Sequence, residues 1–406
     1  MKQPRICIIG GGASGIMAAL IARQNDAQVT ILERNPRIGK KLLLTGNGRC
    51  NYTNIFAQKD DYYHPDFVSP ALDAFSPKQT IKFFEKLGIY PKIETEGKTF
   101  PLSEQASSFL DVALYELDRL GVEVITDSYV QSVVSTKPGF MIYLKDGSKY
   151  EADKIIITTG GKAMPRSGSE GSGYALAETL GHSVTSVFPA LTKLKLESPF
   201  LKQLDGVKFF GTVELLLDNE TIQKESGDVL FTKYGISGPA ILQLSRKANE
   251  LCLNGKQPLI KVIIINGLDI QAIKSRMEAS LEKPIDFSLV GLINKRLIPA
   301  ILKEAGVIKQ NAKLDTLTKA EIEKIIQLLF DWRFEIKGSM GFDDAQVTAG
   351  GVNVEEIDSH TMESKIISGL YFAGEVMDID AKCGGYNLQW AWSSGYLAGI
   401  SAANRG

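Results

Sequence analysis

The feature that most constrains the fold of this chain is a glycine-rich turn near residue 10. The turn follows a short apolar run, Arg5–Ile9, and precedes a segment rich in helix formers, Ala13–Asn25. Val29–Leu32 is a second apolar run, typical of a strand buried in a parallel sheet. Strand, glycine turn, helix and strand in this order make the βαβ unit with which a Rossmann-like domain begins.

The turn carries a G-x-G-x-x-G pattern that fits a dinucleotide. The first glycine permits the tight turn, the second lets the backbone approach a pyrophosphate, and the third lets helix and strand pack closely. Glu33 ends the next strand, where a carboxylate meets the hydroxyls of an adenosine ribose and disfavours a 2′-phosphate. The alternative, an accidental glycine turn with a surface glutamate, is disfavoured by the combination. We predict a site for an ADP moiety that comprises Gly10, Gly12, Ala13, Ser14, Gly15 and Glu33.

Composition and charge exclude several classes of protein. With 406 residues, 44% of them hydrophobic and 23% charged, the chain suits two or three globular domains. A formal net charge of −1 gives no global positive field, and no apolar stretch approaches the roughly 18 residues of a membrane helix. We therefore expect neither a nucleic-acid nor a membrane partner. The cysteines form no C-x-x-C pair, which favours a reducing cytoplasm, and the three histidines lack metal-ligand spacing, so we expect no metal site.

Changes of hydrophobic period divide the chain into stretches. Helical patterns at Pro77–Leu87 and Ala106–Leu120 precede a small β-meander at Val122–Thr158. After about residue 190, strands are predicted at Val207–Leu217, Thr221–Lys224 and Leu259–Ile265, followed by about four amphipathic helices. From Val347 the pattern returns to that of a nucleotide-binding domain. We predict a discontinuous first domain, residues 1–190 and 340–406, and an inserted domain, residues 191–339, with a helical subdomain at about 268–330.

Two later segments separate a flavin site from a site for NAD. Ile155–Gly161 is a strand that ends in a small-residue turn, and Gly369–Glu375 is a strand that ends in glycine and an acidic residue. They resemble the second and third signatures of the two-dinucleotide-binding-domain flavoproteins, in which the acidic residue holds the ribityl-phosphate region. Here that residue is Glu375 rather than the more usual aspartate.

Four longer segments narrow the resemblance: Thr45–Asn54, Leu230–Pro239, Val347–Val352 and Gly385–Ala391. They are similar to the BaiN-like (YhiN-like) family of flavoproteins, over nearly the full chain. The resemblance implies an α/β fold in which a Rossmann-like FAD-binding domain with a β-meander is interrupted by an inserted β-barrel-like plus helical domain. It also implies an FAD-dependent oxidoreductase that uses NADH or NADPH and reduces carbon–carbon double bonds of steroid-like substrates.

The motifs and the resemblance together predict further cofactor-binding residues beyond the ADP motif. They are Arg34, Lys40, Lys41, Gly46, Asn47, Arg49, Cys50, Val130, Thr159, Gly160, Gly161, Gly374, Glu375, Gly384, Gly385, Tyr386, Asn387 and Leu388.

Several of these predictions have a plain structural alternative. Arg34, Lys40 and Lys41 either neutralise phosphates or lie in a solvated basic loop. Backbone amides at Gly385–Leu388 would stabilise negative charge on a reduced flavin, although glycines also precede ordinary core helices. Thiols near the isoalloxazine, at Cys50 and Cys383, would act as donors or redox partners, but small buried cysteines are commoner.

Two other segments stay open. Gly168–Tyr174 is a second glycine turn before a helix; we expect it to wrap near the flavin or to carry the chain into the insert. Lys233 and Tyr234 lie between a strand ending at Thr232 and a helix whose start signals are Ser237 and Pro239. They either face the flavin and supply a proton or simply pack and solvate the turn, so we assign no catalytic residue.

The function predicted from the sequence is the passage of a hydride from a nicotinamide to the flavin and then to an electrophilic carbon. The substrate is expected to be a small molecule bound between the flavin domain and the insert. Two other functions stay open: an FAD-dependent RNA-modifying enzyme, which would need a basic groove, and a non-catalytic FAD-binding sensor. The insert carries no nicotinamide-binding fingerprint, so the nicotinamide is expected to dock transiently.

Overall fold

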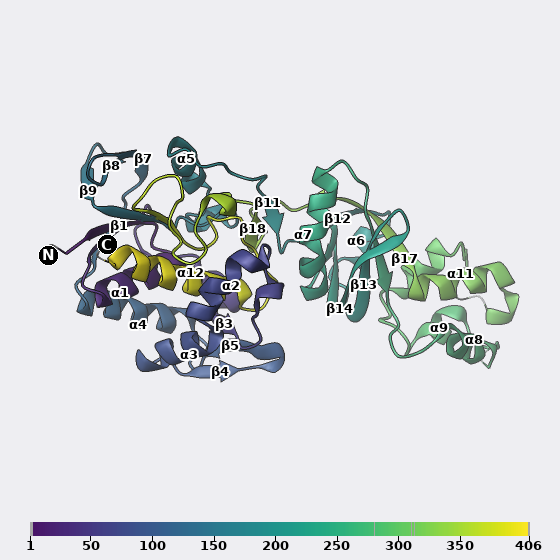
Figure 1. Ribbon diagram of the computed structural model, residues 1–406. Coiled ribbons are helices and arrows are strands. Elements are labelled where there is room, and N and C mark those ends of the chain that lie inside the picture. Colours follow the sequence, from purple (N-terminus) through teal and green to yellow (C-terminus); the bar gives the residue numbers. More distant parts are fainter. Residues whose placement is uncertain (1–2, 280, 310, 312, 405–406) are drawn as a thin grey trace. The chain divides into compact units, whose positions relative to one another are not determined.

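The computed structural model describes residues 3–279, 281–309, 311 and 313–404 (Figure 1). It divides into two compact units, residues 1–189 with 346–406, and residues 190–345. The second boundary lies further along the chain than the sequence predicts, because residues after the last barrel strand stay bonded to the barrel. Met340 N donates to Lys193 O at 3.1 Å, and Lys193 pairs with Asp344 at 2.7 Å.

A five-stranded parallel sheet forms the centre of the first unit. Its strand order is β19-β10-β1-β2-β6, and each neighbouring pair runs parallel. The strands are β1 (Arg5–Ile9), β2 (Gln28–Leu32), β6 (Glu123–Ile125), β10 (Lys154–Ile157) and β19 (Leu370–Phe372). β19 comes from the last part of the chain, so the sheet is complete only when both halves of this unit are present.

Two helices, α1 (Ala13–Gln24) and α12 (Tyr386–Ala403), lie side by side in the first unit (Figure 1). A Cβ at Gly395 would lie 2.5 Å from the carbonyl oxygen of Ser14, and one at Gly399 would lie 2.6 Å from that of Ala18. The two glycines therefore let the helix backbones approach more closely than any side chain would permit. This contact fixes the first turn of α1.

The rest of the first unit surrounds this sheet. It contains the helices α2 (Pro65–Ala74), α3 (Pro77–Lys86), α4 (Ala106–Arg119) and α5 (Ser172–Thr179). One small antiparallel sheet is β3 (Thr53–Asn54), β5 (Lys98–Pro101) and β4 (Pro91–Ile93); the meander is β7 (Val130–Ser135), β8 (Phe140–Leu144) and β9 (Lys149–Ala152). β11 (Phe188–Ala190) pairs with β18 (Val347–Ala349). Short 3₁₀ helices are η1 (Leu42–Gly48), η2 (Lys59–Asp61), η3 (Thr95–Gly97), η4 (Pro165–Ser167) and η6 (Val354–Glu356).

The second unit is a closed antiparallel barrel with attached helices. The barrel order is β12 (Leu194–Glu197), β15 (Gly235–Ser237), β14 (Glu220–Thr232), β13 (Lys208–Leu217), β16 (Leu259–Ile263) and β17 (Trp332–Ser339). Its helices are α6 (Leu201–Leu204), α7 (Pro239–Leu253), α8 (Ile270–Glu278), α9 (Ile285–Leu289), α10 (Ile298–Glu304) and α11 (Lys319–Phe330), with η5 (Leu314–Thr316). Aromatic rings of Phe231, Trp332 and Phe334 pack together in its core. The predicted fold class is thus confirmed.

Four of the six barrel strands differ from the sequence prediction. The strand predicted at Thr221–Lys224 belongs to β14, which continues to Thr232 because Ser226, Gly227 and Asp228 pair with β13 despite their turn-like composition. The strands β12, β15 and β17 were not predicted. No helix within the described ranges is both long enough and apolar enough to cross a bilayer.

Candidate functional site

A cavity lies at the carboxyl ends of the parallel strands in the first unit. Ligands of open α/β sheets bind at this edge. Fourteen of the residues predicted from the sequence line the cavity: Gly10, Gly12, Ala13, Ser14, Glu33, Arg34, Lys40, Lys41, Val130, Thr159, Gly160, Glu375, Asn387 and Leu388. The structure thus brings together the dinucleotide turn, the end of β2 and the start of α12.

Three predicted glycines pack directly behind this lining. A Cβ at Gly15 would collide with the carbonyl oxygen of Gly10, one at Gly161 would lie 2.6 Å from Thr348 Cβ, and one at Gly374 would lie 2.5 Å from Ser14 Oγ. Their role in the structure is close packing of the turns that form the cavity.

The remaining predicted residues lie outside the lining: Gly46, Asn47, Arg49, Cys50, Gly384, Gly385 and Tyr386. Arg49 forms ion pairs of 2.9 Å with Glu94 and Glu104, and its guanidinium lies 4.1 Å from the centre of the Phe100 ring. Burial raises the pKa of the Cys50 thiol to about 12. Contact between either side chain and a cofactor stays a prediction.

Glu33 is buried at the end of β2 and organises the turn. Its Oε2 accepts a hydrogen bond from Gly11 N at 2.8 Å, and its Oε1 accepts from the backbone and side chain of Asn35 at 2.8 and 2.7 Å. A carboxylate has about four acceptor positions, so Oε2 keeps capacity for a ribose hydroxyl. Glu33 therefore both shapes the turn and presents an acceptor to the cavity.

We expect Glu33→Ala to weaken FAD binding by about 10- to 100-fold, because hydrogen bonds to a charged group contribute roughly 1.5 to 3 kcal/mol. Fluorescence titration of the apoprotein measures the dissociation constant. Glu123→Ala, at an exposed carboxylate on β6, is the control and should bind FAD like the wild type. Unchanged affinity in a well-folded Glu33→Ala protein would show that this carboxylate does not contact the cofactor.

The first turn of α1 presents backbone to the cavity. Its N-cap is Gly12. Apart from its neighbours in the chain, the atom nearest to a Cβ placed on Gly12 is the carbonyl oxygen of Thr158, at 3.9 Å, so the space beside this glycine is open. The helix N-terminus carries partial positive charge and unpaired amide groups, both of which suit a pyrophosphate. Thr159 Oγ1 is buried without a hydrogen-bond partner among the described residues, and it lies against Gly173 of α5.

A second helix N-terminus lies at the other end of the cavity. Gly385 is the N-cap of α12, with φ of 101°, and no side chain caps the helix there. The amide of Asn387 is occupied: it bonds to the backbone of Ala381 and Lys382. The unpaired groups at this end are therefore backbone amides, which suit the negative charge of a reduced flavin.

Other lining residues were not predicted as cofactor contacts. They are Gly11, Asn35, Gly39, Thr45, Ser128, Tyr129, Thr158, Ser167, Gly168, Ser169, Ser172, Leu176, Gln346, Val347, Ile379, Trp390 and Ala391, with Ile9, Leu32 and Leu42. One group of these residues belongs to the glycine turn before α5, which the sequence had marked as a segment that could wrap near the flavin. Gly168, Ser169 and Ser172 do reach the cavity, whereas nothing in the local sequence marks Ser128 or Tyr129.

Cys383 lies next to the cavity lining, whereas Lys233 and Tyr234 belong to the second unit. Cys383 Sγ lies 3.6 Å from Oε1 of Gln346, a lining residue, and burial raises the pKa of this thiol. Lys233 is exposed in the second unit, where its backbone N–H donates to Asp205 Oδ1 at 3.0 Å. Tyr234 is half-buried.

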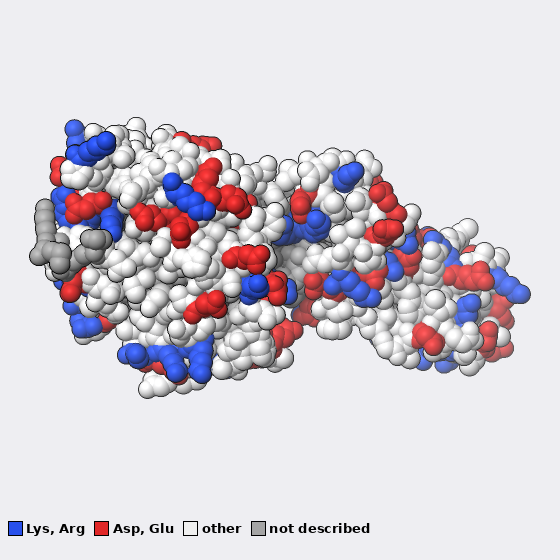
Figure 2. All heavy atoms as spheres, in the orientation of Figure 1, with Lys and Arg blue, Asp and Glu red and all other residues white. Residues whose placement is uncertain are grey.

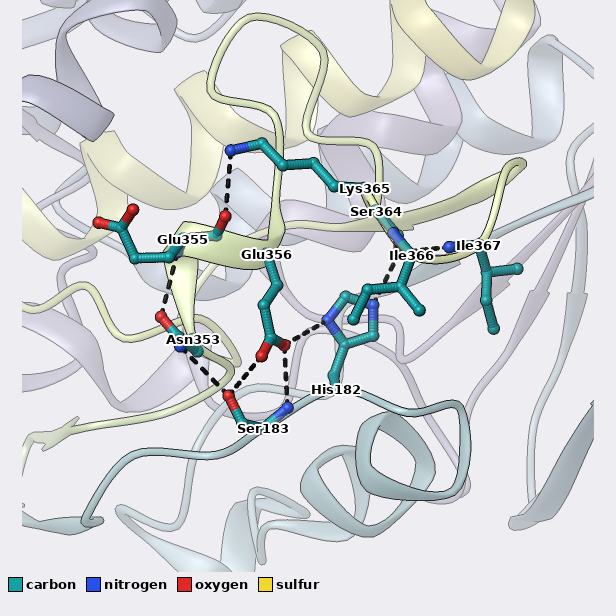
Figure 3. A network of polar contacts seen from close by, with 9 residues as sticks. All are labelled: His182, Ser183, Asn353, Glu355, Glu356, Ser364, Lys365, Ile366 and Ile367. Atoms are coloured by element: carbon teal, nitrogen blue, oxygen red, sulfur yellow. Dashed lines mark hydrogen bonds and ion pairs between the residues drawn. The ribbon is translucent and has the colours of Figure 1, made fainter.

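A polar network centred on His182 joins the chain after α5 to residues 353–367, which precede β19 (Figure 3). His182 Nδ1 lies 3.1 Å from Glu356 Oε2, and Nε2 lies 2.8 Å from Ser364 Oγ. Because the carboxylate only accepts, Nδ1 carries the proton; Ser364 Oγ already accepts from the backbone N–H groups of Ile366 and Ile367, so its hydroxyl donates to Nε2. The ring also meets Phe372 edge-on at 4.8 Å. His182 is therefore a structural residue.

Burial lowers the pKa of His182. It outweighs the nearby carboxylate of Glu356, which by itself would raise that pKa. The unfolded chain then binds a proton that the folded chain does not, so stability falls as the pH drops through about 6.5. We expect His182→Gln to lower the melting temperature at pH 8 and to show a smaller further loss between pH 8 and pH 5.5 than the wild type. Parallel pH profiles of the two proteins would contradict this.

In the described part of the chain, no three histidine, cysteine or acidic side chains are grouped to hold a metal ion. The cavity instead fits FAD: the α1 turn suits the pyrophosphate, Glu33 the ribose and the start of α12 the flavin. Glu375 and Lys41 also line the cavity.

Comparison with known proteins agrees with this geometry. The family model described as HI0933-like protein Rossmann domain matches residues 4–401. The chain is 41% identical over 411 residues to a 3-dehydro-bile acid delta(4,6)-reductase of Clostridium scindens, covering 99% of both chains. It is 32% identical over 402 residues to a ribosomal RNA dihydrouridine synthase of Escherichia coli, covering 98% of this chain and 97% of that one.

Among solved structures, 3-ketosteroid delta1-dehydrogenase from Sterolibacterium denitrificans in complex with 1,4-androstadiene-3,17-dione has a TM-score of 0.52. The match covers 99% of this chain and 100% of that chain at 10% identity, so it concerns the fold alone. The family resemblance predicted from the sequence is confirmed. The chain belongs to the family of HI0933-like proteins, and it is an FAD-dependent oxidoreductase.

Proposed function

We propose that this protein reduces a carbon–carbon double bond conjugated with a carbonyl group in a steroid-like small molecule, with NADH or NADPH as the electron donor. The observation that carries the proposal is the 41% identity, over the full length of both chains, to a protein named as a bile acid reductase. The similarity therefore extends over every segment that contributes to the cavity, and is not confined to the dinucleotide motif.

The chemistry fits the cavity. A conjugated carbonyl makes the far carbon of the double bond electrophilic. FAD bound here and reduced by the nicotinamide would supply a hydride to that carbon, and a proton completes the saturation. The chain's own contribution is position and charge. The backbone amides at the start of α12 stabilise negative charge, and the α1 turn with Glu33 holds the ADP half in register.

The architecture of the second unit bears on how a nicotinamide donor would bind. The described part of that unit contains a closed antiparallel barrel and helices rather than a second parallel sheet. A separate Rossmann-type nicotinamide site is therefore not built there. A nicotinamide that docks transiently and leaves after reduction of the flavin fits this arrangement.

A second candidate substrate is a uridine in ribosomal RNA, because the Escherichia coli relative carries that name. The chemistry is related, since dihydrouridine forms by saturation of a double bond conjugated with a carbonyl. Charge favours the small molecule. The whole chain has a formal charge of −1, and Figure 2 shows basic and acidic side chains intermixed over the face in view. Binding to RNA normally needs a basic surface.

The test begins with the purified protein under anaerobic conditions. Absorbance near 450 nm, roughly as for any oxidised flavin, should disappear when NADH or NADPH is added. Addition of a 3-keto-4,6-diene bile acid should restore it, and mass spectrometry should show that the steroid has gained two hydrogen atoms. A saturated 3-keto bile acid is the control substrate and should leave the flavin reduced.

Two results would overturn the proposal. Failure of the steroid to reoxidise a flavin that oxygen reoxidises normally would exclude the substrate. Formation of dihydrouridine in ribosomal RNA incubated with the reduced protein, without any steroid product, would replace it by the second candidate.

A further inference from the structure

Lys41 and Glu375 form an ion pair between strand ends that are not neighbours in the sheet. Lys41 follows β2 and Glu375 follows β19, and Lys41 Nζ lies 2.6 Å from Glu375 Oε2. β1 and β10 lie between these two strands. At a spacing of about 4.8 Å per strand, β2 and β19 are about 14 Å apart. The loop that follows β2 makes up most of this distance, and the ion pair ties that loop to the end of β19.

The two strands between β2 and β19 carry the turns that line the cavity. β1 leads into the Gly10–Gly12 turn, and β10 leads into the turn at Thr158–Gly160. Both Lys41 and Glu375 also line the cavity. An ion pair between them joins two walls of the dinucleotide site at the level of the pyrophosphate turn.

Glu375 is held firmly on its side. Its Oε1 accepts from Thr348 N at 2.9 Å, and Thr348 Oγ1 in turn accepts from the backbone of Lys162 and Ala163. Gly374, the preceding residue, packs against Ser14 in the first turn of α1. The carboxylate thus has little freedom to shift toward or away from Lys41.

The pair is also shielded from water. The side chains of Lys41 and Glu375 are only 24% and 20% exposed. Charge-assisted hydrogen bonds are roughly twice as strong as neutral ones, and partial burial reduces their screening by salt. The contact is therefore more than a surface ion pair.

We propose that Lys41 is a positioning residue that latches the bound dinucleotide in place through Glu375, and that glutamate is required at residue 375 because aspartate cannot reach Lys41. An aspartate is one carbon–carbon bond shorter, about 1.5 Å, which would open the 2.6 Å contact to about 4 Å. The proposal rests on FAD binding and not on the identity of the reduced substrate.

The experiment measures the rate at which FAD leaves the holoprotein, from the rise in fluorescence of free FAD after dilution. Lys41→Met and Glu375→Asp should each speed release by about 10-fold or more, as expected for loss of a charge-assisted bond. The double variant should release FAD no faster than the faster single variant, because the same latch is lost. Lys78→Met, at an exposed lysine on α3 outside the cavity lining, is the control and should change the rate by less than about 3-fold.

Two outcomes would overturn the latch. If Glu375→Asp releases FAD at the wild-type rate while Lys41→Met is faster, Lys41 acts without the contact to Glu375, and the length of the side chain at residue 375 is irrelevant. If the effects of the single variants add in the double variant, the two residues act separately. Melting temperatures of the apoproteins identify any variant that is misfolded. No substrate enters the assay, so its failure is distinct from failure of the proposed reaction.

Discussion

Gly395→Leu should destabilise the first unit by about 3 kcal/mol or more and abolish FAD binding. A Cβ at this position would already lie 2.5 Å from the carbonyl oxygen of Ser14 and 3.2 Å from Met17 Cβ. The neighbouring atoms belong to the α1 backbone, which cannot retreat without moving the pyrophosphate turn. Circular dichroism during heating measures the loss of stability, and absorbance of the purified protein shows whether FAD is retained.

The matched control is Ser401→Leu, a half-buried position in the last turn of the same helix. This substitution adds similar bulk at a position where the helix does not contact α1 through a glycine. The variant protein should melt at a temperature near that of the wild type. A Gly395→Leu protein with wild-type stability and FAD content would mean that α1 and α12 do not pack as described.

Gly15→Val should lower the affinity for FAD by at least about 100-fold, equivalent to about 2.7 kcal/mol. Its Cβ would collide with the carbonyl oxygen of Gly10 and lie 2.8 Å from Thr158 Oγ1. That hydroxyl lies within hydrogen-bonding distance of two carbonyl oxygens, Gly10 O at 2.6 Å and Ile9 O at 3.0 Å, so the turn is tied on both sides. The dissociation constant for FAD should rise, and the melting temperature should fall.

Gly12→Ala provides the informative contrast. Its backbone angles, φ −80° and ψ −171°, suit any residue, and its Cβ would enter the cavity rather than the protein. We expect normal stability but weaker FAD binding, because the methyl group occupies the approach to the pyrophosphate. Equal FAD affinity of Gly12→Ala and wild type would place the pyrophosphate elsewhere.

The first βαβ unit could be predicted because its determinants are local. An apolar run, three spaced glycines and Glu33 lie within one short stretch, and each acts through neighbours in the sequence. The capping box of Thr318 and Glu321 at the start of α11 is equally local, since both partners lie in one helical turn. The barrel strands were harder. β14 passes through Ser226 and Gly227, whose extended conformation is stabilised by pairing with β13 and not by their own preference.

The cavity could be predicted only in part for the same physical reason. Glu33 and the α1 turn are contiguous with the motif, whereas Ser128 and Tyr129 reach the cavity from the end of a different strand–loop segment. Arg49 was predicted to contact the cofactor because its segment, Thr45–Asn54, resembles that of the flavoprotein family, and this contact stays a prediction. Its partners Glu94 and Glu104 are distant in sequence, so the ion pairs that engage it could not be recognised beforehand.

The order of the strands also sets the order in which the protein can assemble during translation. The second unit is formed by a continuous stretch, residues 190–345, with its own apolar core, so it can fold as soon as that stretch has left the ribosome. The central sheet of the first unit must wait, because β19 and α12 are synthesised after it. A nascent chain therefore exposes the unfinished edge of β10 while the barrel is already complete. The cavity itself is complete only after α12 has been made, because residues of this last helix form part of its lining.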